Sequence, residues 1–261
     1  MKIAVCIKQV VTRDWPLRLD EPGQWVRDQD ASFEMNEPDA YALEEALRLK
    51  EKHGGEVVVC SAGPARVSQV LREALARGAD RALHVESDAL ASADTAAVAT
   101  ALAEALRDES ADLVLTGLQS DDQGFGQTGV VLAELLGIPH STIIMEVEVA
   151  DADTAADGRG TVRVKRELES GFFQWVTMPT PALLTIQSGI NQLRYATLRG
   201  IMAAKKKEIR KLAPEVAPAS GQRIVGLYVP EKAKQTHFID GSAPEAAREL
   251  VRILREDARV F

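Results

Sequence analysis

Cysteine is scarce in this chain, which holds only Cys6 and Cys60 among 261 residues. The two form no Cys-x-x-Cys pair, and the four histidines do not fall at the spacing of metal ligands. Each cysteine lies inside an apolar run that is typical of a buried strand, so we expect two reduced core thiols. The sequence therefore predicts neither a disulfide framework nor a metal site.

Long apolar runs are also lacking, since none approaches the about 20 residues that a membrane helix needs. The first ten residues, MKIAVCIKQV, contain a short apolar run that no small-residue cleavage site follows. The net charge of −8 and the pI of about 5.2 argue against binding of nucleic acid through bulk charge. We expect a cytoplasmic, bacterial-type protein that neither inserts into membranes nor binds nucleic acid.

Familiar catalytic motifs are missing as well. The chain has no GxxxxGK(S/T) loop, no GxGxxG after its first strand, and no GxSxG, HExxH or DFG. Glu44 and Glu45 are neighbours on a predicted helix, where adjacent side chains point apart, so they are poor candidates for a paired acid and base. The sequence predicts a binding surface without a catalytic constellation, which favours a protein that is not an enzyme.

What the sequence does contain is a regular alternation over its first 140 or so residues. Apolar, β-branched runs alternate with segments of helical periodicity, which is typical of a parallel sheet buried on both faces. We therefore predict a three-layer α/β fold with helices on both faces of the sheet. The predicted strands lie at 2–7, 56–61, 79–86 and 111–117, and the predicted helices at 39–53, 63–78, 92–107 and 128–136.

The rhythm changes after residue 140. The segment 161–178 alternates with period two around a turn at 169–171, which predicts a β-hairpin. A Pro/Ala/Gly linker at 213–221 leads towards a last helix, which begins with a capping box at Ser242 and Glu245. Its apolar stripe needs a surface to bury it, either on the domain itself or on a partner. The stripe consists of Ala247, Leu250, Val251 and Leu254.

Parallel α/β sheets bind their ligands beyond the ends of their strands, which directs attention to Lys8 and Gln9, to 35–40 before the first helix, and to the loops 61–65 and 117–129. The last is polar, glycine-punctuated and leads into a helix, so the N–H groups of Gln127, Thr128 and Gly129 are a candidate phosphate cradle. Asp121 and Asp122 would accept ribose hydroxyls or hold the loop's own amides. The alternative is an ordinary strand–helix loop in which Asp and Gly form turns.

A basic segment stands out in this acidic chain. Residues 191–211 read NQLRYATLRGIMAAKKKEIRK, and 199–211 hold six Lys or Arg against one Glu. The preceding LLTIQSGI and this segment resemble the corresponding region of the β subunit of electron transfer flavoprotein, where N-x-x-R-Y-x-x-L-x-x-I-x-x-A-x-K-K recurs. The resemblance extends to VCIKQV, MNEPDAYALEEALRLKEK, SAGPARVSQVLREALARGADRALHV, ADLVLTGLQSDDQGFGQTG and VKRELESG. The C-terminal part is most similar to the branch that serves trimethylamine dehydrogenase.

The resemblance implies one half of an αβ heterodimer that carries electrons. The α subunit would hold the FAD, mainly in its own mobile domain, while this chain, with a fold similar to the adenine-nucleotide α-hydrolases, would bind a structural AMP. Cys6 would serve as wall or through its backbone. Carried over residue by residue, the AMP site would comprise Cys6, Asn36, Glu37, Pro38, Asp39, Ala62, Gly117, Leu118, Gln119, Ser120, Asp121, Asp122, Gln123, Gly124, Phe125, Gly126, Gln127 and Thr128.

The segment 186–208 would be the recognition loop, with Leu198 as the apolar anchor for flavin-dependent dehydrogenases; electrons would continue to a downstream quinone oxidoreductase. Its lysines could steer acidic partners, or they could form a solvated helix face. The partner-recognition residues would be Tyr195, Leu198, Ile201, Lys205, Lys206 and Lys207. The implied division is an α/β nucleotide-binding domain at 1–185 with the hairpin, the recognition loop and a basic helix at 186–211, and an arm at 212–261 that packs on the α subunit.

Two alternatives stay open. Flavin-bifurcating members of the family place a second FAD in the β pocket, and their loop usually ends in Gln-Val-Gly, where this chain has Gln127-Thr128-Gly129. Leu193 also stands where many relatives have proline. The other alternative is an ATP-binding protein of the same fold, such as an ATP pyrophosphatase or a stress-type protein. IKQVVTRD stands where a pyrophosphatase needs an SGGxDS-like loop, and a stress-type protein would be shorter.

Overall fold

The computed structural model describes residues 1–12, 17–27, 29, 31–150, 160–215, 217, 219–230 and 236–260. The chain divides into two compact units, Met1–Gly226 and Leu227–Phe261. The first unit thus includes the segment 186–211 and the beginning of the segment that we assigned to the arm.

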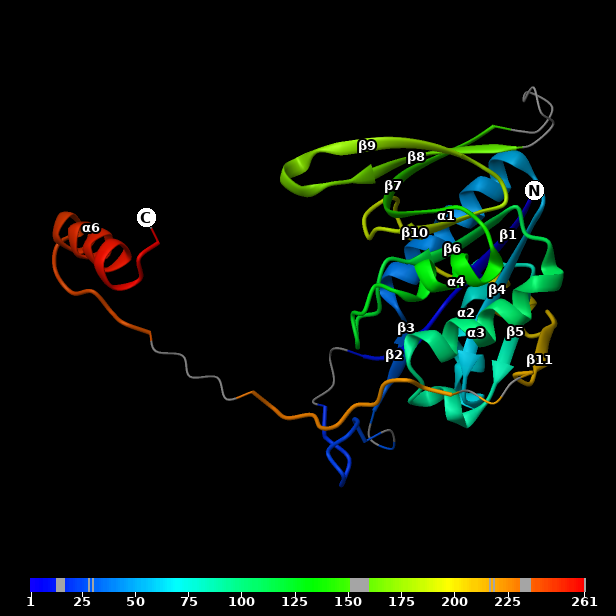
Figure 1. The fold of residues 1–261 in the computed structure, drawn as a ribbon, viewed down its shortest axis with the longest axis horizontal. Coiled ribbons are helices and arrows are strands. Elements are labelled where there is room, and N and C mark those ends of the chain that lie inside the picture. The colour runs from blue at the N-terminus through cyan, green and yellow to red at the C-terminus, as the bar shows by residue number, and fades with distance from the viewer. Residues whose placement is uncertain are drawn as a thin grey trace. The chain divides into compact units, whose positions relative to one another are not determined.

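A nine-stranded sheet forms the centre of the first unit (Figure 1). Its order is β11-β5-β4-β1-β6-β10-β7-β8-β9, and every neighbouring pair is parallel except β7 with β8 and β8 with β9. The strands are β1 (Lys2–Cys6), β4 (Glu56–Gly63), β5 (Arg81–Glu86), β6 (Leu113–Gly117), β7 (His140–Ala150), β8 (Thr161–Glu167), β9 (Phe173–Pro179), β10 (Ala182–Ile186) and β11 (Ile209–Leu212).

Helices cover both faces of the sheet. Strand β1 shows why, because Ile3 and Val5 join a core with α1 and α2, whereas Ala4 and Cys6 join a second core with α3 and α4. Successive strand residues point to opposite faces, so a strand buried on both sides is apolar throughout. The covering helices are α1 (Glu37–His53), α2 (Ser68–Arg77), α3 (Thr95–Leu106) and α4 (Thr128–Leu136).

Shorter elements complete the chain. Strands β2 (Gln9–Val11) and β3 (Phe33–Met35) form a separate antiparallel pair. Helix α5 (Leu198–Ala204) packs on α2, and α6 (Ala243–Arg252) lies in the second unit. One-turn helices are η2 (Ala65–Val67), η3 (Asp88–Ala91), η4 (Arg107–Glu109) and η6 (Glu169–Gly171), and the π-turn η7 (Ile253–Asp257) follows α6.

The predicted three-layer α/β fold is confirmed, and so is the hairpin at 161–178. The sheet is mixed rather than wholly parallel, because the unpredicted strand β7 pairs with both β10 and β8 and joins the hairpin to the sheet. Its sequence, HSTIIMEVEVA, does alternate over its second half.

A helix does lie within 186–211, but it does not carry the three lysines of the predicted basic helix. Helix α5 ends at Ala204, before the three lysines, and the chain then forms β11 parallel to β5. The edge of β5 offers unpaired backbone groups, and β11 satisfies them while Ile209 and Leu212 pack on opposite faces of the sheet. Long-range pairing therefore makes residues 209–212 a strand, and the three lysines form the turn that leads from α5 into it.

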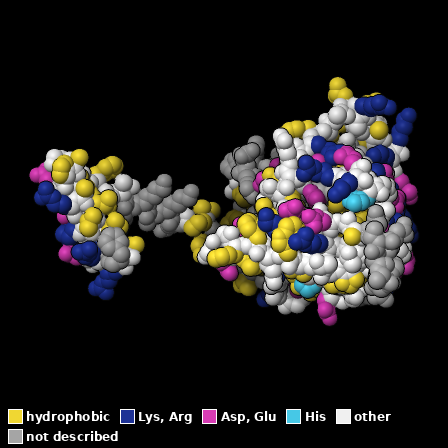
Figure 2. All heavy atoms as spheres, turned by 90° about the horizontal axis from the view of Figure 1, so that it is seen from above, with side chains coloured by type: hydrophobic (Ala, Val, Ile, Leu, Met, Phe, Trp, Pro, Cys, Tyr) yellow, Lys and Arg dark blue, Asp and Glu magenta, His cyan; other side chains and the backbone are white. Residues whose placement is uncertain are grey.

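The capping box at the start of α6 is confirmed, because one carboxylate oxygen of Glu245 accepts from both the N–H (2.9 Å) and the hydroxyl (2.6 Å) of Ser242. Within the C-terminal unit, none of the described residues of α6 is buried. In Figure 2 the C-terminal unit presents yellow hydrophobic side chains on its surface, and Leu250 and Val251 are about half exposed. The C-terminal unit itself thus leaves the stripe without cover among its described residues.

Candidate functional site

A cavity opens at the carboxyl ends of the central strands. The chain moves outward from β1 to β4 and β5, and then returns to place β6 on the other side of β1. This reversal is the switch point at which open α/β sheets bind their ligands. The cavity measures about 1170 Å³ with its open mouth included, and the ends of β1, β4 and β6 line it together with the start of α4.

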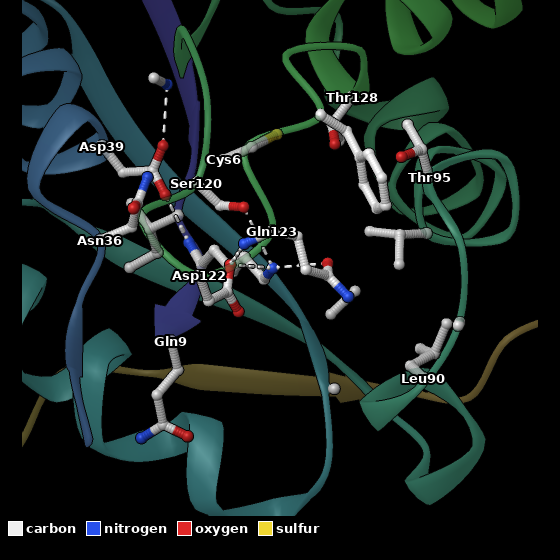
Figure 3. Close-up of a pocket in the computed structure, with 18 of the residues that line it drawn as sticks. Cys6, Gln9, Asn36, Asp39, Leu90, Thr95, Ser120, Asp122, Gln123 and Thr128 are labelled. Atoms are coloured by element: carbon white, nitrogen blue, oxygen red, sulfur yellow. Dashed lines mark hydrogen bonds and ion pairs between the residues drawn. The ribbon is translucent and has the colours of Figure 1, made fainter. Parts of the chain in front are cut away.

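The three loops that we selected from strand ends do come together here. Fourteen of the eighteen predicted AMP-site residues line the cavity. They are Cys6, Asn36, Asp39, Ala62, Gly117, Leu118, Gln119, Ser120, Asp122, Gln123, Phe125, Gly126, Gln127 and Thr128. In Figure 3, Asn36 and Asp39 lie on one side of the cavity and Thr128 on the other. Glu37, Pro38, Asp121 and Gly124 are not among the residues that line it.

Asp39 and Asn36 hold the walls of the cavity together. The buried carboxylate of Asp39 accepts the backbone N–H of Lys8 (2.7 Å) with one oxygen and that of Gly117 (2.8 Å) with the other. The side chain of Asn36 donates to the carbonyl of Gln119 (3.0 Å) and accepts from the N–H of Asp121 (2.9 Å). These two side chains therefore join the start of α1 to the ends of β1 and β6.

Gly117 permits the close approach of the start of α1 to the end of β6. A Cβ at this position would lie 2.4 Å from Oδ1 of Asp39 and 2.7 Å from Cβ of Pro38. Neither neighbour could move without displacing the start of α1. Glycine is thus required at the end of β6 because the first turn of α1 packs directly against it.

Burial raises the pKa of Asp39 from 3.8 to about 7, although the N–H donors of Lys8 and Gly117 oppose the shift. The carboxyl group of Asp39 therefore stays protonated up to a higher pH in the native state than in the unfolded state. The stabilising contribution is therefore present below about pH 4 and is lost as the pH rises to about 7. At about 1.4 kcal/mol per pKa unit, the loss amounts to roughly 4 kcal/mol.

The replacement Asp39→Asn should remove this pH-dependent contribution. We expect the difference in the free energy of unfolding, variant minus wild type, to rise by roughly 4 kcal/mol between pH 4 and pH 8. Chemical denaturation at a series of pH values measures the difference. A difference that stays constant across this range would show that the carboxyl group titrates at its ordinary pKa in the native state.

Lys8 fixes the long loop between β6 and α4. Its ammonium group donates to Oδ1 of Asp122 (2.7 Å) and to Oε1 of Gln123 (3.0 Å). The same oxygen of Asp122 accepts the N–H of Gln123 (2.7 Å), and Asp121 accepts the N–H of Glu37 (3.2 Å). Asp122 thus holds one of the loop's own amides, which is one of the two roles that we offered, whereas Asp121 holds an amide at the start of α1.

The start of α4 faces the cavity through Gln127 and Thr128. The first turn of an α-helix leaves N–H groups without partners inside the helix, and the helix dipole adds positive potential there. Because Asp122 is paired with Lys8, the loop does not direct a free carboxylate at this helix end. The arrangement can accept a phosphate group.

Several residues that line the cavity were missed as site residues. Arg66 donates to Oε1 of Gln9 (2.9 Å) and stacks over the ring of Phe33 at 4.2 Å. Asp94 begins α3 by accepting the N–H of Ala97 (2.9 Å). An Asp-Thr pair ahead of an Ala-rich helix is a capping signal that could have marked Asp94. Arg66 carried no such signal, because its place depends on how η2 packs beside β2.

The two cysteines are free and buried, as predicted. Cys6 lines the cavity, and burial raises its pKa well above the ordinary value. Burial likewise raises the pKa of Cys60 to about 12. Thiols with raised pKa values are poor nucleophiles, which fits the predicted role of Cys6 as part of a wall.

The segment around Leu198 forms a second candidate site. Tyr195 is 90% exposed and Leu198 is 84% exposed, whereas soluble proteins usually bury such side chains. Ile201 is 43% exposed, and Lys205 and Lys206 are exposed beyond the helix. These residues form an exposed apolar ridge, Tyr195–Ile201, with basic side chains after it.

Lys207 has a different place. Its ammonium group donates to the carbonyls of Leu75 (3.2 Å) and Ala79 (2.5 Å), and partial burial lowers its pKa. These carbonyls belong to the C-terminal end of α2 and the turn after it, where cations are favoured. The alternative of a solvated helix face is wrong for Lys207, which is neither on a helix nor fully solvated.

The fold and the position of the cavity define the class, a doubly wound α/β protein with a candidate ligand site at its switch point. Residues 24–217 match the Electron transfer flavoprotein domain. The chain is 38% identical to the electron transfer flavoprotein subunit beta of Methylophilus methylotrophus over 98% of both proteins, and 34% identical to that of Bacillus subtilis over 90% of this chain and 91% of the relative. The mitochondrial subunit of Oryza sativa subsp. japonica is 36% identical over the full length of both. The chain belongs to the family of electron transfer flavoprotein β subunits.

Membership in this family implies an α subunit as the partner in a heterodimer. The relatives are named as subunits of an electron transfer flavoprotein. Within the described residues, the structure contains no helix that is both long enough and apolar enough to span a bilayer.

Proposed function

We propose that the cavity binds AMP as a structural group, and that the chain serves in a heterodimer that accepts electrons from flavin-dependent dehydrogenases. The electrons would pass through an FAD held mainly by the α subunit to a downstream quinone oxidoreductase. The observation that supports AMP is the convergence of three strand ends and the α4 N-terminus on one cavity. The residues at this site hold one another in place, and they suit a bound group that organises the subunit.

The phosphate of AMP would lie against the N–H groups at the start of α4, beside Gly126, Gln127 and Thr128. Helix N-termini bind phosphate through these groups and through the helix dipole. The ribose and the base would fill the space between the ends of β1 and β4, where Cys6 and Ala62 form the wall. The nucleotide would thereby add a further link to the loop between β6 and α4, which Lys8 already joins to the end of β1 and Asn36 joins to the start of α1.

The phosphate contact can be tested with a nucleotide-free heterodimer. AMP should raise the melting temperature and bind at least about tenfold more tightly than adenosine, because adenosine has no phosphate for the α4 N-terminus. AMP at a hundred times its dissociation constant should stabilise the complex by about 2.7 kcal/mol. Equal affinities for AMP and adenosine in calorimetric titration would exclude the proposed phosphate position.

The exposed ridge would recognise the dehydrogenase. A single apolar anchor beside cationic side chains gives a small interface that forms and separates quickly. Leu198 would enter an apolar pocket of the partner, with Tyr195 and Ile201 beside it. Lys205 and Lys206 would attract an acidic partner surface and make the association rate depend on salt.

A second FAD in this cavity is the alternative. It is favoured by one observation, namely that the cavity continues from the phosphate loop to aromatic and apolar side chains at Trp25, Phe33 and Leu90. A flavin ring needs such a surface. The nucleotide content of the purified heterodimer distinguishes this alternative from AMP.

A further inference from the structure

The exposed ridge stands on a segment without regular backbone pairing. Residues 192–197 belong to neither helix nor strand, although Tyr195 in their midst is almost fully exposed. An irregular, solvent-facing segment loses conformational entropy when it is fixed in one form. Side-chain contacts must therefore hold it if the ridge is to keep one conformation before a partner binds.

Arg194 supplies such contacts, immediately before Tyr195. Its Nε donates to Oε2 of Glu44 (2.7 Å), its Nη2 donates to Oε1 of Glu44 (3.0 Å), and its backbone N–H also reaches Oε2 (3.3 Å). Its Nη1 donates to Oε1 of Glu51 (2.5 Å). Arg194, Glu44 and Glu51 are named the arginine clamp below.

The two carboxylates suit this geometry because they lie seven residues apart, which places them on one side of α1 about two turns apart. Glu44 is buried, with 6% of its side chain exposed, whereas 61% of the Glu51 side chain is exposed. Hydrogen bonds from Arg194 hold the pKa of Glu51 below its usual value, and the two glutamates raise the pKa of Arg194. A planar guanidinium can serve two carboxylates in this way, whereas the ammonium of lysine cannot reproduce the fork.

The two ends of the segment are also fixed. Asn191 donates to the carbonyl of Tyr41 (3.1 Å) and to Oε2 of Glu45 (3.0 Å). At the other end, Thr197 caps α5 by accepting the N–H of Gly200 (3.0 Å). Gly200 packs so closely on α2 that a Cβ there would lie 2.3 Å from the carbonyl oxygen of Ala76. The chain between Asn191 and Thr197 is short, and Arg194 fixes it near its middle.

We propose that Arg194 is a positioning residue for partner recognition: the arginine clamp holds residues 191–197 in the form that presents Tyr195 and Leu198 before the dehydrogenase arrives. This inference rests on the proposed recognition role of Leu198. A pre-formed anchor avoids the ordering cost at the moment of binding, so it strengthens binding without adding a contact. The clamp would act through Leu198, and Arg194 itself would not need to touch the partner.

The test uses the heterodimer with the α subunit and two conservative variants, Arg194→Lys and Glu51→Gln. Each keeps most of the side chain, and the second leaves no buried charge without a partner. Arg48→Gln is the matched control, because Nε of Arg48 also lies 3.8 Å from Oε1 of Glu44 but Arg48 makes no hydrogen bond or ion pair with the described residues 191–197. Hydrogen exchange of the amides at 192–199 should become at least about tenfold faster in Arg194→Lys and stay unchanged in Arg48→Gln.

Electron transfer with trimethylamine dehydrogenase as the probe supplies the second readout. In Arg194→Lys we expect the half-saturating concentration of the dehydrogenase to rise about tenfold, with flavin content and melting temperature unchanged. Combined with Leu198→Ala, Arg194→Lys should add little further loss, since both changes remove the same presented anchor. If the fold-losses of the two single variants multiply in the double variant, the proposal is wrong. It is also wrong if hydrogen exchange of the amides at 192–199 is unchanged in Arg194→Lys.

The two failures are distinguishable. If Leu198→Ala transfers electrons as the wild type does, Leu198 has no role in recognition. The arginine clamp then positions no recognition residue. If Leu198→Ala is slow while Arg194→Lys and Glu51→Gln match the wild type in both readouts, recognition stands and the positioning role of Arg194 is wrong.

Discussion

The replacement Leu198→Ala should slow electron transfer with a dehydrogenase by about tenfold to a hundredfold at limiting partner concentration. Leu198 is 84% exposed, so its truncation removes no core packing from this chain. A leucine that fills a partner's pocket contributes about 1.5–3 kcal/mol when it is buried there, which corresponds to this range of rates. Stopped-flow reduction of the heterodimer by the dehydrogenase measures the effect.

The control is an exposed leucine elsewhere. Leu135 on α4 is 48% exposed and lies outside the ridge, so Leu135→Ala should leave the rate within about twofold of the wild type. Flavin content should match the wild type in both variants. An unaltered rate in Leu198→Ala would remove this residue from recognition and leave the exposure of the ridge without a function.

Removal of residues 227–261 should abolish stable pairing with the α subunit. The described residues of this unit bury neither α6 nor Tyr228 within the unit itself. Isolated helices of this length are marginal in water, so α6 needs a partner surface to be stable. We expect size-exclusion chromatography of the truncated chain with the α subunit to show separate proteins.

A milder change tests the apolar stripe itself. Leu250→Ser should weaken the heterodimer by at least about tenfold, while Arg248→Ser on the same helix should leave it nearly unchanged, because a buried leucine contributes about 1.5–3 kcal/mol. The opposite outcome is equally clear. If the chain alone is monodisperse and its α6 amides are fully protected from exchange, the stripe is buried without the α subunit and the proposed docking is wrong.

The fold was largely predictable from periodicity, and the exceptions share a cause. Helix α4 begins and ends at the predicted residues, because Thr128 follows a polar loop and Gly137 stops the apolar run. Strand β11 was missed because Ile209–Leu212 becomes a strand through its register with β5, more than 100 residues earlier. Local preference cannot report such a pairing, and it left the three lysines assigned to a helix.

The candidate site was predictable where it depends on topology. The loops that we selected meet at one cavity because parallel strands end at one edge of the sheet. The roles of individual residues in these loops were not predictable, since each role depends on contacts between residues far apart in the sequence. Asp39 was assigned to ligand binding, yet both its oxygens are occupied by backbone N–H groups of Lys8 and Gly117.

The basic segment illustrates the same limit. Asn191, Arg194, Tyr195 and Leu198 appear alike in the sequence pattern. The structure separates them, because the first two bind α1 while Tyr195 and Leu198 face solvent. Exposure and hydrogen bonding, rather than spacing, distinguish the residues that hold the ridge from those that form it.

The nucleotide content of the co-expressed heterodimer tests the central claim most directly. The complex would be denatured, and the released nucleotides would be quantified on a calibrated column against the protein concentration. We expect AMP and FAD in equal amounts, each equal to the heterodimer. FAD at twice the amount of the heterodimer without AMP would contradict it, because the cavity of this chain would then hold a second flavin.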